Sequence, residues 1–247
     1  MKKFFLFFGL AVIINVGCQK KLTNPFENLG VSHNQIMDSL ATKTGFLSMD
    51  RNKIYDAVYP FISAQSKASK MDTAEYATFI NYIDILSNAK KEAPALLLRD
   101  KKINKKMKDL LGELYTILLS DEGSTNVTPA EMTKRLKDFE TTVMRKHGTP
   151  STNLGKNSDV AMVIAGSAIA RYSYAYWFDA AQNPKNVWHL AFTGNSGGNE
   201  TSLRTWWGAV KADVGGFFSG DCFYEDEFVW DLNCAWSTAA AASAAAR

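Results

Sequence analysis

Three cysteines carry the most specific chemistry in this sequence, and the first one directly follows a basic and apolar N-terminal segment. Two lysines precede an apolar run over residues 4–16, which ends at Gly17 and Cys18. A basic start, an apolar stretch of about 7–15 residues and a small residue before the cut are typical of a secretory signal peptide. The run is too short to cross a membrane, which takes about 20 apolar residues. We therefore predict a signal peptide over 1–17, with Cys18 at the start of the mature chain. The alternative to a specific role for Cys18 is an ordinary signal peptide that a cysteine follows by chance.

The segment Asn15-Val16-Gly17-Cys18 resembles the lipobox of bacterial lipoproteins, although Asn15 stands where that family usually has Leu. The resemblance implies that the Cys18 thiol takes a diacylglycerol and that its freed amine is acylated, as with palmitate. Stable anchoring takes two lipid signals, which several chains on one residue supply. Because Gln19 rather than Asp follows Cys18, the resemblance also implies the outer membrane, with the body facing the periplasm or the cell surface.

Cys222 and Cys234 are an even pair in a chain that we expect to be exported. Such pairs commonly form disulfides outside the cytosol. The loop that they would close is short, so the bond would stabilise the fold by about 3 kcal/mol. A metal site is the weaker interpretation, because the spacing is not that of a zinc motif and no His lies close by. We predict a Cys222–Cys234 disulfide.

The remaining reactive side chains do not form a catalytic pattern. His33, His147 and His189 are not at metal-ligand spacing, and the sequence contains no HExxH, nucleophile elbow or phosphate-binding loop. Carboxylates such as Asp226 and Glu227 could serve a glycosidase only if they faced each other across a cleft. We therefore assign no catalytic residue, metal or cofactor, and favour a role without catalysis.

Five aromatic residues motivate one alternative function. Aromatic faces stack on sugars, so exposed rings would indicate a surface lipoprotein that binds glycans. The competing interpretation, which we favour, is that these rings belong to the core. The five residues are Tyr172, Tyr176, Trp188, Trp206 and Trp207.

The overall charge argues against a nucleic-acid partner. The 247 residues carry a formal net charge of +3, which falls further once the two lysines of the signal peptide are removed. A nucleic-acid-binding chain would show a strongly basic patch. Lysines do cluster within 101–108, either as an anion or membrane-surface patch or as the solvated face of a helix, and we favour the second interpretation.

Apolar periodicity predicts an all-α protein that begins with a mobile tether over 18–30 and a helical bundle over 31–148. Within the bundle we predict a helix over 33–42, a helix from Asp50 that Pro60 should kink or split, and a helix that is capped at Asp72. A long helix is predicted over 95–120.

The last helix of the bundle has the most specific signals. Thr128 is a good N-cap, Pro129 suits the first helical position, and Gly148 follows a basic last turn. A helix over 129–147 is therefore predicted.

Residues 147–157 are rich in Gly, Pro, Ser, Thr and Asn, and all 6 tryptophans follow them. We place a boundary there and predict a Trp-rich, Gly/Ala-rich helical part over 157–247, which either is separate or packs on the same core. Ser158 or Asn157 should cap its first helix, which should end before Asn183-Pro184. A long loop over 185–200 and a helix from Thr201 are then predicted.

Small residues recur at every fourth position in the next helix, at Gly208, Ala212, Gly216 and Gly220. This spacing lets helices approach closely and is known from membrane helices, so a membrane-active C-terminal segment is a third hypothesis. Lys211 and Asp213 interrupt the pattern, and we favour close packing against the Ala/Gly-rich stretch 160–170.

The C-terminal half resembles uncharacterised cell-envelope lipoproteins of Gram-negative bacteria. The resemblance rests on the aromatic stretch 171–177, Trp206-Trp207, the segment 211–216 and the Ala/Ser-rich tail. It implies an envelope location and carries over no catalytic residue. The sequence thus predicts a lipid-anchored envelope protein with a structural or interaction role, held to the membrane by lipid on Cys18 and bound to an unidentified envelope protein or glycan.

Overall fold

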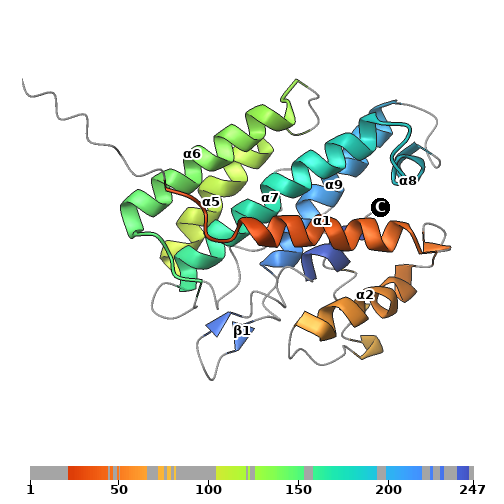
Figure 1. Ribbon diagram of the computed structural model, residues 1–247, viewed down its shortest axis with the longest axis horizontal. Helices are drawn as coiled ribbons and strands as arrows, with labels where there is room; N and C mark the ends of the chain where they lie inside the picture. The colour runs from red at the N-terminus through yellow and green to blue at the C-terminus, as the bar shows by residue number, and fades with distance from the viewer. Residues whose placement is uncertain are drawn as a thin grey trace, which may run out of the picture.

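The structure is a computed structural model, and it confirms the predicted all-α class (Figure 1). It describes residues 22–43, 45–46, 49, 51–65, 72–74, 77–78, 81, 104–120, 122, 126–152, 158–193, 199–218, 223–224, 229–230 and 238–244. The helices in chain order are α1 (Glu27–Ala41), α2 (Arg51–Gln65), α5 (Lys105–Leu119), α6 (Pro129–His147), α7 (Ser158–Gln182), α8 (His189–Thr193) and α9 (Asn199–Phe217). Residues 238–244, called the terminal segment below, are also helical.

One short antiparallel ladder is the exception to the helical architecture within the described part of the chain. It pairs β1 (Phe223–Tyr224) with β2 (Val229–Trp230), each 2 residues long. Phe223 lies opposite Trp230, and Tyr224 lies opposite Val229.

Helix α7 is the centre of the molecule. It contacts α1, α5, α6, α8 and α9, and it runs between them in Figure 1. Its residues from Val160 to Arg171 are all buried. A helix that is apolar on every side is stable only when other elements surround it, which explains the central position. The two predicted parts, 31–148 and 157–247, therefore share one core, which extends from Phe26 to Ala244.

The strongest sequence signals for a helix are confirmed in α6. The Thr128 side chain accepts a hydrogen bond from the backbone N–H of Glu131 at 3.2 Å, and Pro129 occupies the first turn. Gly148 ends the helix with φ of 85°, a conformation that side chains with a Cβ rarely adopt. Local chemistry alone accounts for these boundaries.

Other boundaries differ from the predictions. Helix α5 starts at Lys105, because Asn104 is extended and its side chain accepts from Met107 N–H at 2.9 Å; the prediction of one helix over 95–120 is wrong. Helix α2 continues through Pro60 instead of splitting there. The Asp72 cap is confirmed, since its carboxylate accepts from Ala74 N–H at 2.8 Å. The predicted loop over 185–200 contains α8.

The predicted tether over 18–30 also ends earlier than expected. Helix α1 begins at Glu27, and Asn24 and Phe26 are already buried in front of it. The Asn24 side chain donates to Ile164 O at 3.0 Å and accepts from Phe26 N–H at 2.8 Å. A side chain that satisfies backbone groups on both segments docks the chain onto α7 before the helix starts.

Small residues allow close packing around α9. A Cβ on Gly166 of α7 would overlap the ring of Phe218, which follows α9 directly, so the 160–170 stretch packs closely against the end of α9. Gly216 instead faces the terminal segment, where an added Cβ would lie 2.7 Å from Ala242 Cβ and 2.9 Å from Thr238 O. Residues 206–218 are all buried, so α9 is a core helix in the folded protein.

Among the helices that the structure describes, none combines the length and apolarity that a membrane crossing requires.

Candidate functional site

Asp213 on α9 is the centre of a buried polar cluster that joins three helices. Its Oδ1 lies 2.9 Å from Nε2 of His33 on α1. Its Oδ2 accepts from Ser173 Oγ at 2.5 Å and from Trp177 Nε1 at 2.8 Å, both on α7. All four residues, the Asp213 cluster, are fully buried. One carboxylate therefore attaches α1 and α9 to the same stretch of α7.

The hydrogen-bond partners of His33 favour its charged form. Its Nδ1 lies 3.0 Å from Asn34 Oδ1, and the Asn34 amide donates to Tyr172 O at 3.3 Å. Both ring nitrogens thus face oxygen acceptors, and only the imidazolium donates from both. Burial lowers the pKa of His33, but the charge of Asp213 and the hydrogen bonds outweigh it, so the pKa is raised above its ordinary 6.5. The pair is a buried ion pair.

The Asp213 cluster contains Ser, His and Asp, but its connections are not those of a nucleophilic triad. In a triad the serine donates to the histidine, and the carboxylate orients that histidine through its other nitrogen. Here Ser173 and His33 both donate to Asp213. The Ser173 hydroxyl is also fully buried, out of reach of a substrate in solvent. This arrangement can fix helices in place but is not built for acyl transfer.

A second cluster, buried except for the partly exposed Glu27, surrounds Arg171 on α7. The Arg171 Nη2 lies 2.9 Å from Glu27 Oε2 on α1 and 3.3 Å from Glu140 Oε1 on α6. Ser167, one turn before Arg171, donates to the same Glu140 oxygen at 3.0 Å. These four residues, the Arg171 cluster, attach α1 and α6 to α7 on a different face from the Asp213 cluster.

Burial and ion pairing act in opposite directions on the pKa values of Glu140 and Arg171. Burial raises the pKa of Glu140, and the nearby Arg171 counteracts it only in part. Burial lowers the pKa of Arg171, but the charges of Glu140 and Glu27 outweigh it and raise it overall. A pair of this kind contributes little net stability when intact, but removing one partner leaves an uncompensated buried charge.

The three predicted glycan-stacking tryptophans lie in the core. Trp206 and Trp207 stack on each other with centroids 4.8 Å apart, and Tyr174 packs edge-on against both. Trp188 is fully buried, and its indole N–H donates to Tyr176 Oη at 2.8 Å. These three rings therefore belong to the core, as the favoured interpretation expected, and are not exposed for stacking on sugars.

The two predicted tyrosines are half-buried and make structural contacts. The ring of Tyr172 covers Gly30 of α1, and the Arg171 guanidinium lies 5.2 Å from its centroid. The hydroxyl of Tyr176 donates to Asp38 Oδ1 at 2.9 Å. Burial, followed by the Asp38 contact, raises the pKa of Tyr176 far above its usual range. Both side chains hold α1 against α7.

The three cysteines lie outside the described residues, so Cys18 lipidation and the Cys222–Cys234 disulfide stay predictions. The acidic pair Asp226 and Glu227 lies outside them too. Within the part of the chain that is described, no group of three or more His, Cys, Asp or Glu side chains is placed to hold a metal.

Sequence reasoning missed the residues that form the two clusters. His33 was considered only as a metal ligand, and Asp213 only as an interruption of the small-residue pattern. A detectable signal existed, because Asp213 and Arg171 each stand within apolar stretches of helix. A charged side chain at such a position is buried and therefore needs a partner. The identity of the partners was not visible in the pattern.

Comparisons of the chain with protein-family models, with curated proteins and with solved structures each found no match.

Proposed function

We propose that this chain is a lipid-anchored cell-envelope protein whose helical body has a structural or interaction role. The observation that carries the proposal is the N-terminal pattern of two lysines, an apolar run over 4–16, and Gly17-Cys18. This pattern has the charge, length and cleavage chemistry of an export signal, with a thiol at the first mature position. Lipid on that thiol would supply the membrane attachment.

The start of the folded body supports attachment to the lipid through a short linker. Asn24 is hydrogen-bonded to α7 and lies six residues after Cys18 in the sequence. An extended chain spans about 3.3–3.6 Å per residue, so the body would stay within about 20 Å of the lipid. The anchor would therefore restrict the position of the helical bundle and not only its location in the cell.

The use of reactive side chains supports a role without catalysis. Ser173, His33 and Asp213 bind one another in the core, and Arg171 and Glu140 do the same between α6 and α7. These groups hold helices together. We do not extend the proposal to glycan binding, because three of the five aromatic residues that motivated it, the tryptophans, are buried.

Metabolic labelling with an alkyne analogue of palmitate tests the anchor. The wild-type chain should take up the label and stay with the membrane fraction after a high-salt wash. Cys18→Ala should lose the label and keep its signal peptide, whereas Cys222→Ala, the matched control, should keep the label. An unlabelled wild-type chain, or a Cys18→Ala chain that is labelled as strongly, would overturn the proposal.

A further inference from the structure

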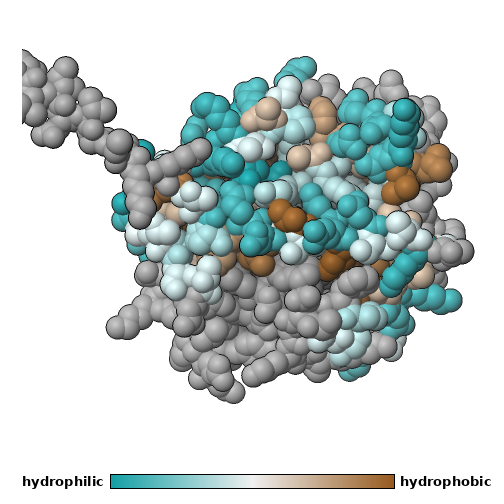
Figure 2. Space-filling model, in the orientation of Figure 1, coloured by the Kyte–Doolittle hydropathy of each residue, from teal (hydrophilic) through white to brown (hydrophobic). Residues whose placement is uncertain are grey.

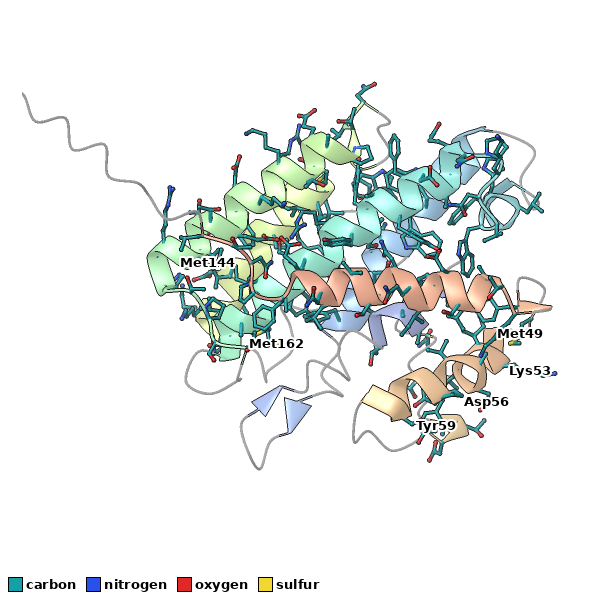
Figure 3. The ribbon with its side chains drawn as sticks, in the orientation of Figure 1. Met49, Lys53, Asp56, Tyr59, Met144 and Met162 are labelled. Carbon is teal, nitrogen blue, oxygen red and sulfur yellow. The ribbon has the colours of Figure 1, made fainter. Side chains whose placement is uncertain are left out.

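Six basic residues meet at one end of the helical body, where α6 ends and α5 begins. We call this group the basic end: Lys105, Lys106 and Lys108 of α5, with Arg145, Lys146 and His147 of α6. The start of α7 lies there too, since Asn104 donates to Asp159 at 2.7 Å. In Figure 3, Met144 of α6 and Met162 of α7 mark this end, and Lys53 of α2 lies at the opposite end.

The basic end is exposed and positive. Lys105, Lys106, Arg145 and Lys146 are exposed, and hydrophilic side chains cover the region of α6 in Figure 2. Three carboxylates lie near it: Asp109, which pairs with Lys105 at 2.9 Å, Asp159 and Glu113. The pKa of His147 is nevertheless lowered, first by burial and then by the charges of Lys106 and Lys146.

Helix stability explains the basic residues of α6 but not all of those in α5. Cations at a helix C-terminus interact favourably with the helix dipole, which suits Arg145 and Lys146. The first turn of α5 contains lysines and no acidic residue. Cations at a helix N-terminus face the positive end of the dipole and destabilise the helix. Lys105 is accounted for by its ion pair with Asp109 one turn later, so a role outside the fold is needed mainly for Lys106.

The chain enters the body at this same end. Figure 1 shows the described N-terminal segment beside the end of α6 and the start of α5. Asn24 contacts Ile164 in the first part of α7 and the Glu140 side chain of α6. The residues between Cys18 and this point include two more lysines, Lys20 and Lys21. The positive charge thus lies at the end of the body where the described chain begins.

We propose that the basic end lies against the anionic headgroups of the membrane leaflet that holds the Cys18 lipid. The inference rests on the proposed function, because it requires lipid at Cys18. Basic residues beside a lipid anchor bind anionic membrane surfaces, and each contributes about a fivefold gain in partitioning. The two contacts together orient the body. Helix α8 then lies on the side of the body that is far from the membrane. The length of α7, about 37 Å for its 25 residues, separates α8 from the basic end.

Amine labelling of the lipidated full-length chain in vesicles tests this orientation. The chain is incorporated into vesicles of phosphatidylcholine, with or without phosphatidylglycerol, recovered by flotation and treated with an acetylating reagent. With phosphatidylglycerol, labelling of Lys106 and Lys146 should fall about fivefold or more. Labelling of Lys53 and Lys185, which are exposed elsewhere, should not change. The protection should disappear at about 1 M salt, where the Debye length is about 3 Å.

Two charge-matched triple variants separate the basic end from net charge. Both replace three exposed lysines with Gln, and Lys108, which remains in each, is the reporter of protection. The test variant is Lys105→Gln/Lys106→Gln/Lys146→Gln, and the control is Lys53→Gln/Lys137→Gln/Lys185→Gln. Lys108 should lose its protection in the test variant and keep it in the control.

The outcomes distinguish the inference from the anchor. A chain that floats with the vesicles, but whose Lys106 and Lys146 react equally with and without phosphatidylglycerol, overturns the inference and leaves the anchor standing. A wild-type chain that does not float overturns the anchor, and the inference with it. Equal loss of Lys108 protection in both triple variants would overturn the assignment to the basic end.

Discussion

Replacing Asp213 with Asn tests whether one carboxylate holds α1 and α9 on α7. Three donors point at this side chain, from His33, Ser173 and Trp177. Asn has nearly the same shape, but it offers one acceptor oxygen and places an NH₂ group among the donors. The substitution therefore removes the negative charge and leaves buried donors without acceptors, while the volume of the core stays constant.

The expected loss in the free energy of unfolding is about 3–5 kcal/mol. Removing one partner of a buried ion pair costs about that much. Each buried unsatisfied donor costs about 1–3 kcal/mol, but these terms do not add, because the groups form one network. The free energy of unfolding of an ordinary domain is about 5–15 kcal/mol. The variant should therefore be marginally stable, with an unfolding transition that can still be measured.

The pH dependence should change sign between the two proteins. In the wild type the pKa of His33 is raised above 6.5, so its contribution to stability is complete below about pH 6.5 and declines as the pH rises through the raised value. Without Asp213 only burial and the Asn34 contact remain, and burial keeps the pKa of His33 low. The variant should therefore gain stability as the pH rises toward 6.5. The difference in the free energy of unfolding between the wild type and the variant should then narrow with rising pH.

Urea unfolding followed by tryptophan fluorescence, at about pH 5, 6.5 and 8, measures both effects. Asp138→Asn is the matched control, because that carboxylate is 67% exposed and pairs with Lys134 on the surface of α6. It should change the free energy of unfolding by no more than about 1 kcal/mol. A loss of less than about 1 kcal/mol in Asp213→Asn, or a gap that widens with rising pH, would refute the reasoning.

Gly30→Ala should lower the free energy of unfolding by about 1–3 kcal/mol in thermal denaturation, because its methyl group overlaps the Tyr172 ring; unchanged stability would contradict that contact. Gly216→Val should detach the terminal segment, since its Cβ would press on the backbone there, and limited proteolysis should then remove the C-terminus faster than in the wild type. Oxidised protein should react with a thiol reagent at neither Cys222 nor Cys234 until it is reduced, and alkylation of both before reduction would exclude the disulfide.

Local sequence signals predicted the parts of the fold that depend on a few neighbouring residues. The cap at Thr128 and the glycine at Gly148 set the ends of α6 as expected. The break at Asn183-Pro184 likewise ends α7 at Gln182. These boundaries follow from backbone hydrogen bonds and allowed dihedral angles, which act within a single turn.

Where apolar periodicity or loop composition competed with a hydrogen-bonding side chain, the sequence alone did not decide which would set the structure. The apolar periodicity over 95–120 continued across Asn104, but the cap at Asn104 starts a new helix there. The sequence suggested a mobile tether over 18–30, but the Asn24 side chain satisfies backbone groups of α7 and Phe26. In both cases one polar side chain gains its hydrogen bonds from a particular backbone geometry, which periodicity does not register.

The sequence by itself determined that the protein is helical, which stretches form α6 and α7, and that charged residues stand within apolar helices. Only the tertiary structure decided which charges meet. His33 and Asp213 are 180 positions apart, and their contact exists because α1 and α9 pack on adjacent faces of α7. A buried charge must find a partner, but the choice of partner depends on how helices pack together, and packing is a property of the assembled core.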